Sequence, residues 1–321
     1  MKHVKLIFLP FFALLLATGC GCDHSIPSVN DLFSQQDSRP PMIVSSKAAD
    51  TSTVVIQFDE NLEKNSITLN VNGVPNTNYL CNQSTLSLFL FAPMKLATFC
   101  NVEGRVEDKR GNSTRFSLNV WAKNTNRASV IINEFSTKGS TSNPDRVELL
   151  VTKGGNLAGI TLANGSQSSY TDRCILPDLR VYQGDYLVVS FQKGEERTQF
   201  SSEKLVGLGS NNGCLTICES PDWESALLDA VLYSNLTTST YNGFGSRALE
   251  EGAKTLYEQG QWTAFQVEGA INSSNSTATR TLCRNQGQDT NSKEDWYVCD
   301  TKEASFGTRN SSKHFIPAQE E

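Results

Sequence analysis

The chain has 321 residues, a formal net charge of −6 and nine cysteines. A negative chain offers no basic field for nucleic acid, so we expect no nucleic-acid partner. Its three histidines, His3, His24 and His314, lie outside the stretches expected to form a folded core. This argues against Ser-His-Asp, Cys-His and histidine-ligated zinc sites, and no acidic pair stands out as catalytic. We therefore expect a protein that is not an enzyme, with no cofactor and no metal.

The N-terminal residues have the pattern of an export signal. Two lysines precede an apolar run over residues 6–17, which is too short to cross a bilayer, since crossing needs about 20 residues. The run ends at Ala17-Thr18-Gly19-Cys20, which resembles the lipobox of bacterial lipoproteins. The resemblance implies cleavage before Cys20 and lipidation of its thiol, so residues 1–19 form the predicted signal peptide. The alternative is a simple secretory signal, with Cys20 and Cys22 as ordinary thiols.

A lipid anchor predicts a membrane-attached protein of the bacterial cell envelope, on either the periplasmic or the exterior side. Residues 20–41 are rich in Asp, Ser, Gln and Pro and are predicted to form a flexible tether. In an exported chain, cysteines are expected in disulfides rather than as reduced thiols.

Residues 42–122 are predicted to form the first folded unit. Apolar residues recur at every second position in five short runs, which are 54–58, 67–71, 86–90, 102–106 and 116–120. This is the period of a strand with one buried face, and Asn72-Gly73 is a strong turn signal between two of the runs. Short strands at near-regular spacing predict an antiparallel sandwich.

Two motifs of this unit resemble bacterial Ig-like domains. The segment from Ile56 to Leu62 is similar to their opening turn, and Val106-Glu-Asp108-Lys-Arg-Gly111-Asn112 is similar to their closing hairpin. The resemblance implies that Asp108 and its neighbours shape a turn and have no catalytic role. Cys81 and Cys100 are the only cysteines of the unit, and we predict a disulfide between them that joins neighbouring strands.

The second unit, residues 129–310, carries a longer set of motifs. Val130-Ile-Ile-Asn133-Glu134-Phe135 and Asp145-Arg-Val-Glu148-Leu-Leu150 resemble the lamin-tail domain, whose terminal motif is matched by Ser305-Phe-Gly307-Thr-Arg-Asn310. The resemblance implies a second Ig-like sandwich, in a family without a shared catalytic activity. The predicted fold class is therefore all-β, with two tandem Ig-like β-sandwich domains. One short helix is predicted over residues 247–257, and residues 311–321 form a tail.

Three polar residues are singled out by the lamin-tail resemblance. Asn133, Glu134 and Glu148 either form a carboxylate cluster for a cation or bond to backbone groups within the sandwich, and we favour the structural interpretation. Asp289-Thr-Asn291-Ser-Lys293-Glu294 is similar to the start of a calcium loop. Because Lys293 occupies a position that needs an oxygen ligand, we predict a turn there.

The remaining cysteines are assigned only in part. Cys283 and Cys299 bracket the predicted turn and are disulfide candidates between its two flanking strands. Cys214 and Cys218 lie in one predicted strand, where four residues span about 13 Å, too far for a disulfide between them. The pairing of Cys22, Cys174, Cys214 and Cys218 stays open. Trp223 is the aromatic residue most suited to contact a ligand from an exposed turn.

The sequence thus predicts a lipid-anchored cell-envelope protein with a non-catalytic binding or scaffolding role. One alternative is an adhesin that binds carbohydrate or host matrix. Another is an accessory subunit of a secreted hydrolase or nuclease. The expected partners are a membrane, through the lipid anchor, and a protein or glycan ligand whose identity the sequence leaves open.

Overall fold

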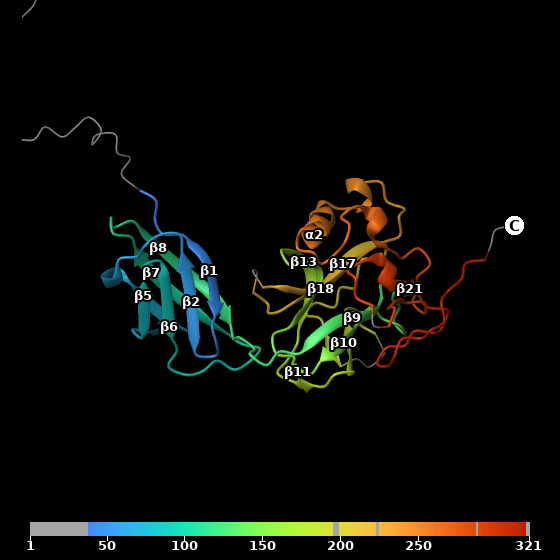
Figure 1. Cartoon of the computed structure of the whole chain (residues 1–321), viewed down its shortest axis with the longest axis horizontal. Coiled ribbons are helices and arrows are strands. Elements are labelled where there is room, and N and C mark those ends of the chain that lie inside the picture. The colour runs from blue at the N-terminus through green and yellow to red at the C-terminus, as the bar shows by residue number, and fades with distance from the viewer. Residues whose placement is uncertain (1–37, 195–198, 223–224, 287, 319–321) are drawn as a thin grey trace, which may run out of the picture. The chain divides into compact units, whose positions relative to one another are not determined.

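The fold is described from a computed structural model, over residues 38–194, 199–222, 225–286 and 288–318. The predicted signal peptide, Cys20, Cys22 and Trp223 lie outside these residues. Contacts divide the chain into Met1–Arg39 and Pro40–Glu321, and the description concerns the second of these units. Almost all of its regular structure is strand, so the predicted all-β fold is confirmed (Figure 1). Among the described residues, no helix combines the length and the hydropathy needed to span a membrane.

The first hydrophobic core lies in a sandwich of two four-stranded sheets. One sheet has the order β1-β2-β6-β5 and the other β4-β3-β7-β8. Their strands are β1 (Ile43–Ala48), β2 (Thr53–Phe58), β3 (Thr68–Val71), β4 (Val74–Pro75), β5 (Tyr79–Asn82), β6 (Thr85–Phe89), β7 (Phe99–Glu107) and β8 (Ser113–Trp121), with a 3-10 turn η1 (Lys64–Ser66) before β3. Each of the five alternating runs of the sequence overlaps a strand of this sandwich.

Local chemistry fixes the turns of this sandwich. Asn72 and Gly73 join β3 to β4 with φ of 51° and 77°, the left-handed conformation that a two-residue hairpin of this kind requires. The Asp108 carboxylate accepts hydrogen bonds from the backbone N–H groups of Arg110 and Asn112, at 2.8 and 2.9 Å. Asp108 therefore holds the β7–β8 hairpin together.

The second core lies in a larger sandwich, which also has two main sheets. Their orders are β16-β15-β10-β9-β20-β21 and β13-β12-β17-β18-β19, with a small β11-β14 pair beside them. The strands are β9 (Ser129–Ser136), β10 (Arg146–Lys153), β11 (Gly155–Asn156), β12 (Thr161–Ser166), β13 (Ser169–Ile175), β14 (Arg180–Val181), β15 (Tyr186–Ser190), β16 (Phe200–Ser201), β17 (Asn212–Cys218), β18 (Leu227–Ser234), β19 (Ile271–Asn272), β20 (Leu282–Arg284) and β21 (Trp296–Val298).

One helix packs on the second sandwich. α2 (Arg247–Glu258) contains the predicted helical segment and packs against β12 and β17 (Figure 1). Its Ser246 side chain accepts a hydrogen bond from the Leu249 N–H, which is the usual N-cap arrangement. Ala253 and Leu256 are fully buried, so the apolar side of the helix faces the sheet. The short 3-10 turns are η2 (Tyr241–Gly243), η3 (Val267–Gly269) and η4 (Lys293–Asp295).

A β-bulge in β9 sets the direction of the polar residues on the larger sheet. Glu148 of β10 pairs with Glu134, whereas the next residue, Leu149, pairs with Ile132. Asn133 is therefore an extra residue on β9, and a bulge of this kind re-aims side chains. Ile132 remains in the core between the sheets, while Glu134 turns to the opposite face.

Candidate functional site

The outer face of the β9–β10–β20 region carries a set of buried polar side chains. Glu134 of β9 lies between Glu148 of β10 and Cys283 of β20, with direct pairing on both sides. Both glutamates and the cysteine are fully buried. Arg146 precedes Glu148 by two residues on the same strand, so its side chain lies on the same face. Polar groups buried in this way need partners from the chain that covers them.

The covering chain is residues 299–315, which we call the C-terminal strap. The strap begins after β21, and its two ends lie together, because Asp300 N–H donates to the Lys313 carbonyl at 3.0 Å. The Lys313 ammonium reaches the Glu303 carboxylate at 2.7 Å and closes the loop further. The terminal motif of the lamin-tail resemblance, Ser305 to Asn310, lies in the middle of the strap.

Ser305 holds the Glu134 carboxylate. Its backbone N–H donates to both carboxylate oxygens, at 3.0 and 3.1 Å, and its hydroxyl donates to Oε2 at 2.7 Å. The Thr281 hydroxyl donates to Oε1 at 2.5 Å. Every oxygen of this buried carboxylate therefore has a donor, two of the three donors coming from one strap residue.

Glu148 and Asn133 hold the next part of the strap. The Gly307 N–H donates to Glu148 Oε2 at 2.5 Å, and the Asn133 amide donates to Oε1 at 2.7 Å. The Asn310 amide donates to the carbonyls of Asn133 and Arg284, at 3.1 and 2.8 Å. The three residues singled out from the sequence are thus brought together, and each bonds to the strap.

Burial has the largest effect on the pKa values of the two glutamates at this site. Burial raises the pKa of Glu148 to about 8, and the nearby Glu134 charge adds to the rise, while hydrogen bonds from Asn133 and Gly307 oppose it. Burial also raises the pKa of Glu134, against the hydrogen bonds from Thr281 and Ser305. Arg146 lowers both pKa values through its charge, and its guanidinium lies 4.0 Å from the centre of the Phe306 ring.

This arrangement matches the structural interpretation of Asn133, Glu134 and Glu148. Their polar atoms are used by strap residues and by one another. In the described part of the chain, no group of three or more His, Cys, Asp and Glu side chains has the geometry of a metal site.

Two thiols lie next to the glutamates. Cys283 follows Thr281 by two residues, and Cys299 is the first residue of the strap. The Thr281 hydroxyl lies 3.6 Å from the Cys283 sulfur and 3.1 Å from the Cys299 sulfur. The two cysteines also hydrogen-bond to each other. Both are free thiols in this structure, so the predicted disulfide remains a prediction, with its two partners in contact.

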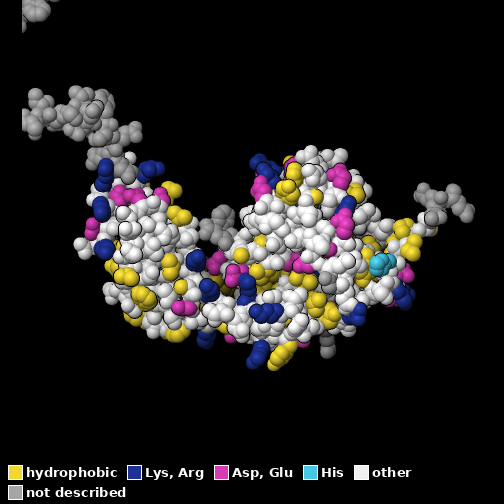
Figure 2. All heavy atoms as spheres, in the orientation of Figure 1, with side chains coloured by type: hydrophobic (Ala, Val, Ile, Leu, Met, Phe, Trp, Pro, Cys, Tyr) yellow, Lys and Arg dark blue, Asp and Glu magenta, His cyan; other side chains and the backbone are white. Residues whose placement is uncertain are grey.

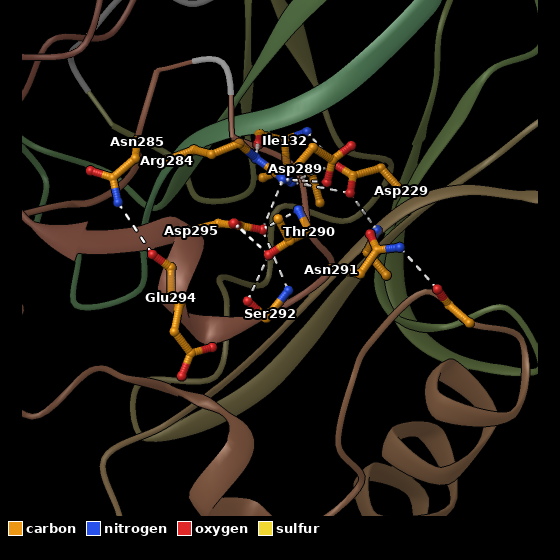
Figure 3. Close-up of polar contacts among 12 residues, drawn as sticks. Ile132, Asp229, Arg284, Asn285, Asp289, Thr290, Asn291, Ser292, Glu294 and Asp295 are labelled. Atoms are coloured by element: carbon orange, nitrogen blue, oxygen red, sulfur yellow. Dashed lines mark hydrogen bonds and ion pairs between the residues drawn. The ribbon is translucent and has the colours of Figure 1, made fainter.

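A second buried cluster lies in the interior of the same sandwich, around Arg284 (Figure 3). Its guanidinium donates to both oxygens of Asp229 on the facing sheet, at 3.1 and 2.9 Å, and to the Ile132 carbonyl at 2.7 Å. It also donates to Asp289 at 2.7 Å and lies 4.8 Å from the Trp296 ring centre. Arg284 thus joins the two sheets and the turn that follows β20.

The segment that is similar to a calcium loop forms a turn, as expected. Asp289 is engaged by Arg284, and the Asp295 carboxylate accepts hydrogen bonds from the Thr290 N–H and hydroxyl, at 2.7 and 2.8 Å (Figure 3). Lys293 points away to donate to the Glu268 carbonyl at 2.8 Å. The Asp289 and Asp295 carboxylates therefore bond to protein donors.

The other five cysteines of the described residues are buried thiols. Cys81 lies on β5 and Cys100 on β7, which belong to different sheets of the first sandwich. The expectation of neighbouring strands was therefore wrong, because both side chains enter the core between two sheets. A bond between them, still a prediction, would join the sheets.

In the second sandwich, the strand register separates the cysteines whose pairing was open. Cys174 pairs with Leu162, whereas Cys218 pairs with the adjacent Thr161. Because neighbouring residues of a strand point to opposite faces, Cys174 and Cys218 lie on opposite faces of one sheet. Cys214 shares the face of Cys218, so Cys174 has neither of them as a partner.

One of the three histidines, His314, lies within the described residues and is exposed. Figure 2 shows a histidine side chain at the surface near the C-terminal end, and His314 is the histidine of the described residues. Its ring stacks on Tyr297 with the centroids 3.9 Å apart. The predicted lipidation site Cys20 and the predicted ligand contact Trp223 fall outside the described residues.

Comparison with known proteins gives one family match. The family model described as TP_1001_2nd, protein second domain, matches residues 128–204 and 200–298, together just over half of the chain. No curated protein matches the sequence.

Two solved structures show a low similarity to this chain. Dimeric latent PorU from Porphyromonas gingivalis has a TM-score of 0.21 and 11% identity, covering 61% of this chain and 20% of PorU. An auxiliary nutrient binding protein from Bacteroides thetaiotaomicron has a TM-score of 0.19 and 10% identity, covering 83% of this chain and 72% of that protein. The match thus spans a fifth of the length of PorU.

Proposed function

We propose that this protein is a non-catalytic binding or scaffolding protein of the bacterial cell envelope. Its chain belongs to the family described as TP_1001_2nd, protein second domain. In this proposal a lipid on Cys20 holds the protein at a membrane. The first sandwich is a bacterial Ig-like domain and the second a lamin-tail-like domain, and together they present a binding surface to a protein or glycan ligand.

The proposal rests on how the fold uses the polar residues of the lamin-tail resemblance. Asn133, Glu134 and Glu148 are the residues that the lamin-tail resemblance singles out. All three bond to the C-terminal strap, and Asn133 also donates to Glu148. Side chains engaged in this way hold the strap on the sheet, and their polar atoms are not directed at a substrate. This supports a domain that acts by binding other molecules at its surface.

The anchor is tested by one substitution with a matched control. Cys20→Ala should leave an unprocessed precursor or move the protein out of the detergent phase, whereas Cys22→Ala, two residues later, should leave both processing and partitioning unchanged. Labelling with a palmitate analogue should be lost only in the Cys20 variant. Unchanged partitioning of Cys20→Ala, together with no labelling of the wild type, contradicts lipid anchoring.

The binding role is tested in intact cells. Crosslinking followed by co-purification of the full chain should recover a specific envelope partner, and the same partner should be lost when either sandwich is deleted. Binding on a glycan and matrix-protein array, with no crosslinked envelope partner, would favour an adhesin instead. Hydrolase or nuclease activity of the purified chain or of a recovered complex would favour the accessory role.

A further inference from the structure

Cys283 of β20 and Cys299, the first residue of the C-terminal strap, form a compact site. Cys299 N–H donates to the Thr281 carbonyl at 3.0 Å, so Cys299 lies opposite Thr281 at the end of the β20–β21 ladder. Cys283 lies two residues from Thr281 and therefore on the same face. The two sulfur atoms share the Thr281 hydroxyl and hydrogen-bond to each other.

The environments of the two thiols differ. The Cys299 sulfur accepts a hydrogen bond from the Thr281 N–H at 3.1 Å and contacts the Thr281 hydroxyl at 3.1 Å. The hydrogen bonds from Cys283 and from the Thr281 N–H lower the pKa of Cys299, against the effect of burial. The hydrogen bond between the two thiols raises the pKa of Cys283, and burial raises it further. The thiolate, which is the nucleophile in disulfide exchange, therefore forms first on Cys299.

We propose that Cys299 and Cys283 form a thiol–disulfide exchange site, with Cys299 as the attacking thiol, Cys283 as the resolving thiol and the strap as the element that controls access. The co-reactant is an external disulfide, either a small molecule or a protein thiol oxidant.

The exchange proceeds in two steps. The Cys299 thiolate attacks one sulfur of the external disulfide, and the first external thiolate leaves and takes up a proton. The Cys283 thiolate then attacks the Cys299 sulfur of the mixed disulfide, and the second external thiolate leaves. Two protein thiols are oxidised to one disulfide, and one external disulfide is reduced to two thiols.

Access depends on the strap because both thiols are fully buried. Cys299 forms a backbone bridge with His314, and the His314 ring stacks on Tyr297. An external disulfide therefore reaches Cys299 only when the strap lifts or before it docks during folding.

The exchange is tested with the full chain, reduced and then exposed to oxidised glutathione, followed by alkylation and peptide mapping. The wild type should form the internal Cys283–Cys299 disulfide. Cys283→Ser should accumulate a mixed disulfide at Cys299, and Cys299→Ser should react at Cys283 at least tenfold more slowly. Cys174 and Cys214 serve as internal controls, because burial raises the pKa of each to about 12.

Strap control is tested with a variant that weakens docking without touching a thiol. Asn310→Ala removes the amide that binds the Asn133 and Arg284 carbonyls, so it should increase the rate of glutathione reaction at Cys299 several-fold. Asn285→Ala is the matched control, because its amide donates to the Glu294 carbonyl, away from the strap. Its reaction rate should equal that of the wild type.

Three outcomes overturn the inference. The attacking role of Cys299 fails if Cys283 forms the mixed disulfide as fast in Cys299→Ser. Strap control fails if Asn310→Ala and Asn285→Ala react at the same rate. The site itself fails if the wild type forms no Cys283–Cys299 bond under any oxidant. Should a serine variant not fold, early quenching of the wild-type reaction still identifies which cysteine carries glutathione first.

Discussion

Glu134 and Glu148 face each other directly across β9 and β10, and both side chains are fully buried. Like charges at directly opposite positions destabilise a sheet, and burial adds a desolvation cost for each charge. The strap offsets this cost with N–H and hydroxyl donors from Ser305 and Gly307. Burial, with a smaller contribution from the Glu134 charge, raises the pKa of Glu148 to about 8, so near neutral pH a proton on Glu148 removes one of the two charges.

The raised pKa of Glu148 predicts a stability that falls as pH rises. The folded protein holds the Glu148 proton up to about pH 8, whereas the unfolded chain releases it near the ordinary value of 4.5. Between these values the folded state binds more protons, so the free energy of unfolding decreases with increasing pH. Glu148→Gln should make the free energy of unfolding less dependent on pH. The difference in this free energy between the variant and the wild type should shift in favour of the variant from pH 5 to pH 8.

The measurement is urea denaturation of the full chain at several pH values. Glu258→Gln, at an exposed position on α2, is the matched control and should keep the wild-type slope. A Glu148→Gln profile that runs parallel to the wild type would show that Glu148 is already ionised in the folded protein.

The alternating runs of the sequence predicted most strands of the first sandwich because a two-residue period follows directly from one buried face. β1 and β5 were not among the predicted runs. Both are edge strands, and Ile43–Ala48 has only one buried position, so it needs little apolar alternation. The helix at 247–258 was predicted from its composition, and Ser246 supplies the N-cap.

The polar site was predicted only in part. The two adjacent polar residues Asn133 and Glu134 interrupt the apolar pattern of β9. This interruption is the feature of the sequence that corresponds to the bulge. Arg284 and Asp229 were given no role, although each is a charge within an apolar strand segment. Their pairing joins residues 55 positions apart, and strap contacts join residues more than 150 apart, so no local pattern specifies them.

Docking of the strap by Asn310 should contribute measurably to stability. Asn310→Ala leaves the buried carbonyls of Asn133 and Arg284 without this donor, and unsatisfied buried groups cost about 1–3 kcal/mol. The free energy of unfolding from urea titration should fall by that amount. Asn285→Ala, whose amide makes one longer contact at 3.3 Å, should change it by less than about 0.5 kcal/mol. Equal effects of the two variants would argue against specific docking.

At the proposed envelope location a Cys81–Cys100 disulfide is expected, since both side chains enter the same core from facing sheets. The bond would close a loop of about 20 residues and stabilise the sandwich by about 3 kcal/mol on the chain-entropy estimate. Non-reducing peptide mapping of protein from the envelope should recover the linked peptides. Thiols at both positions that alkylate after unfolding without reductant would refute the bond.

Asp229 should be among the most sensitive positions of the second sandwich. Asp229→Ala leaves the Arg284 guanidinium, which is almost fully buried, without the partner that accepts two of its hydrogen bonds. Removing one member of a buried ion pair costs about 3–5 kcal/mol. The Ile132 N–H loses its acceptor in the same variant, which adds to the loss.

The matched control is Asp289→Ala, which removes a different carboxylate from the same guanidinium. The Asp289 side chain is 41% exposed, whereas that of Asp229 is 1% exposed. Exposed ion pairs contribute about 0–1 kcal/mol, so Asp289→Ala should shift the urea midpoint much less. Replacing both Asp229 and Arg284 with apolar residues should cost less than Asp229→Ala alone, because no unpaired charge then remains in the core. If Asp229→Ala is no more damaging than Asp289→Ala, the buried pair does not hold the two sheets together.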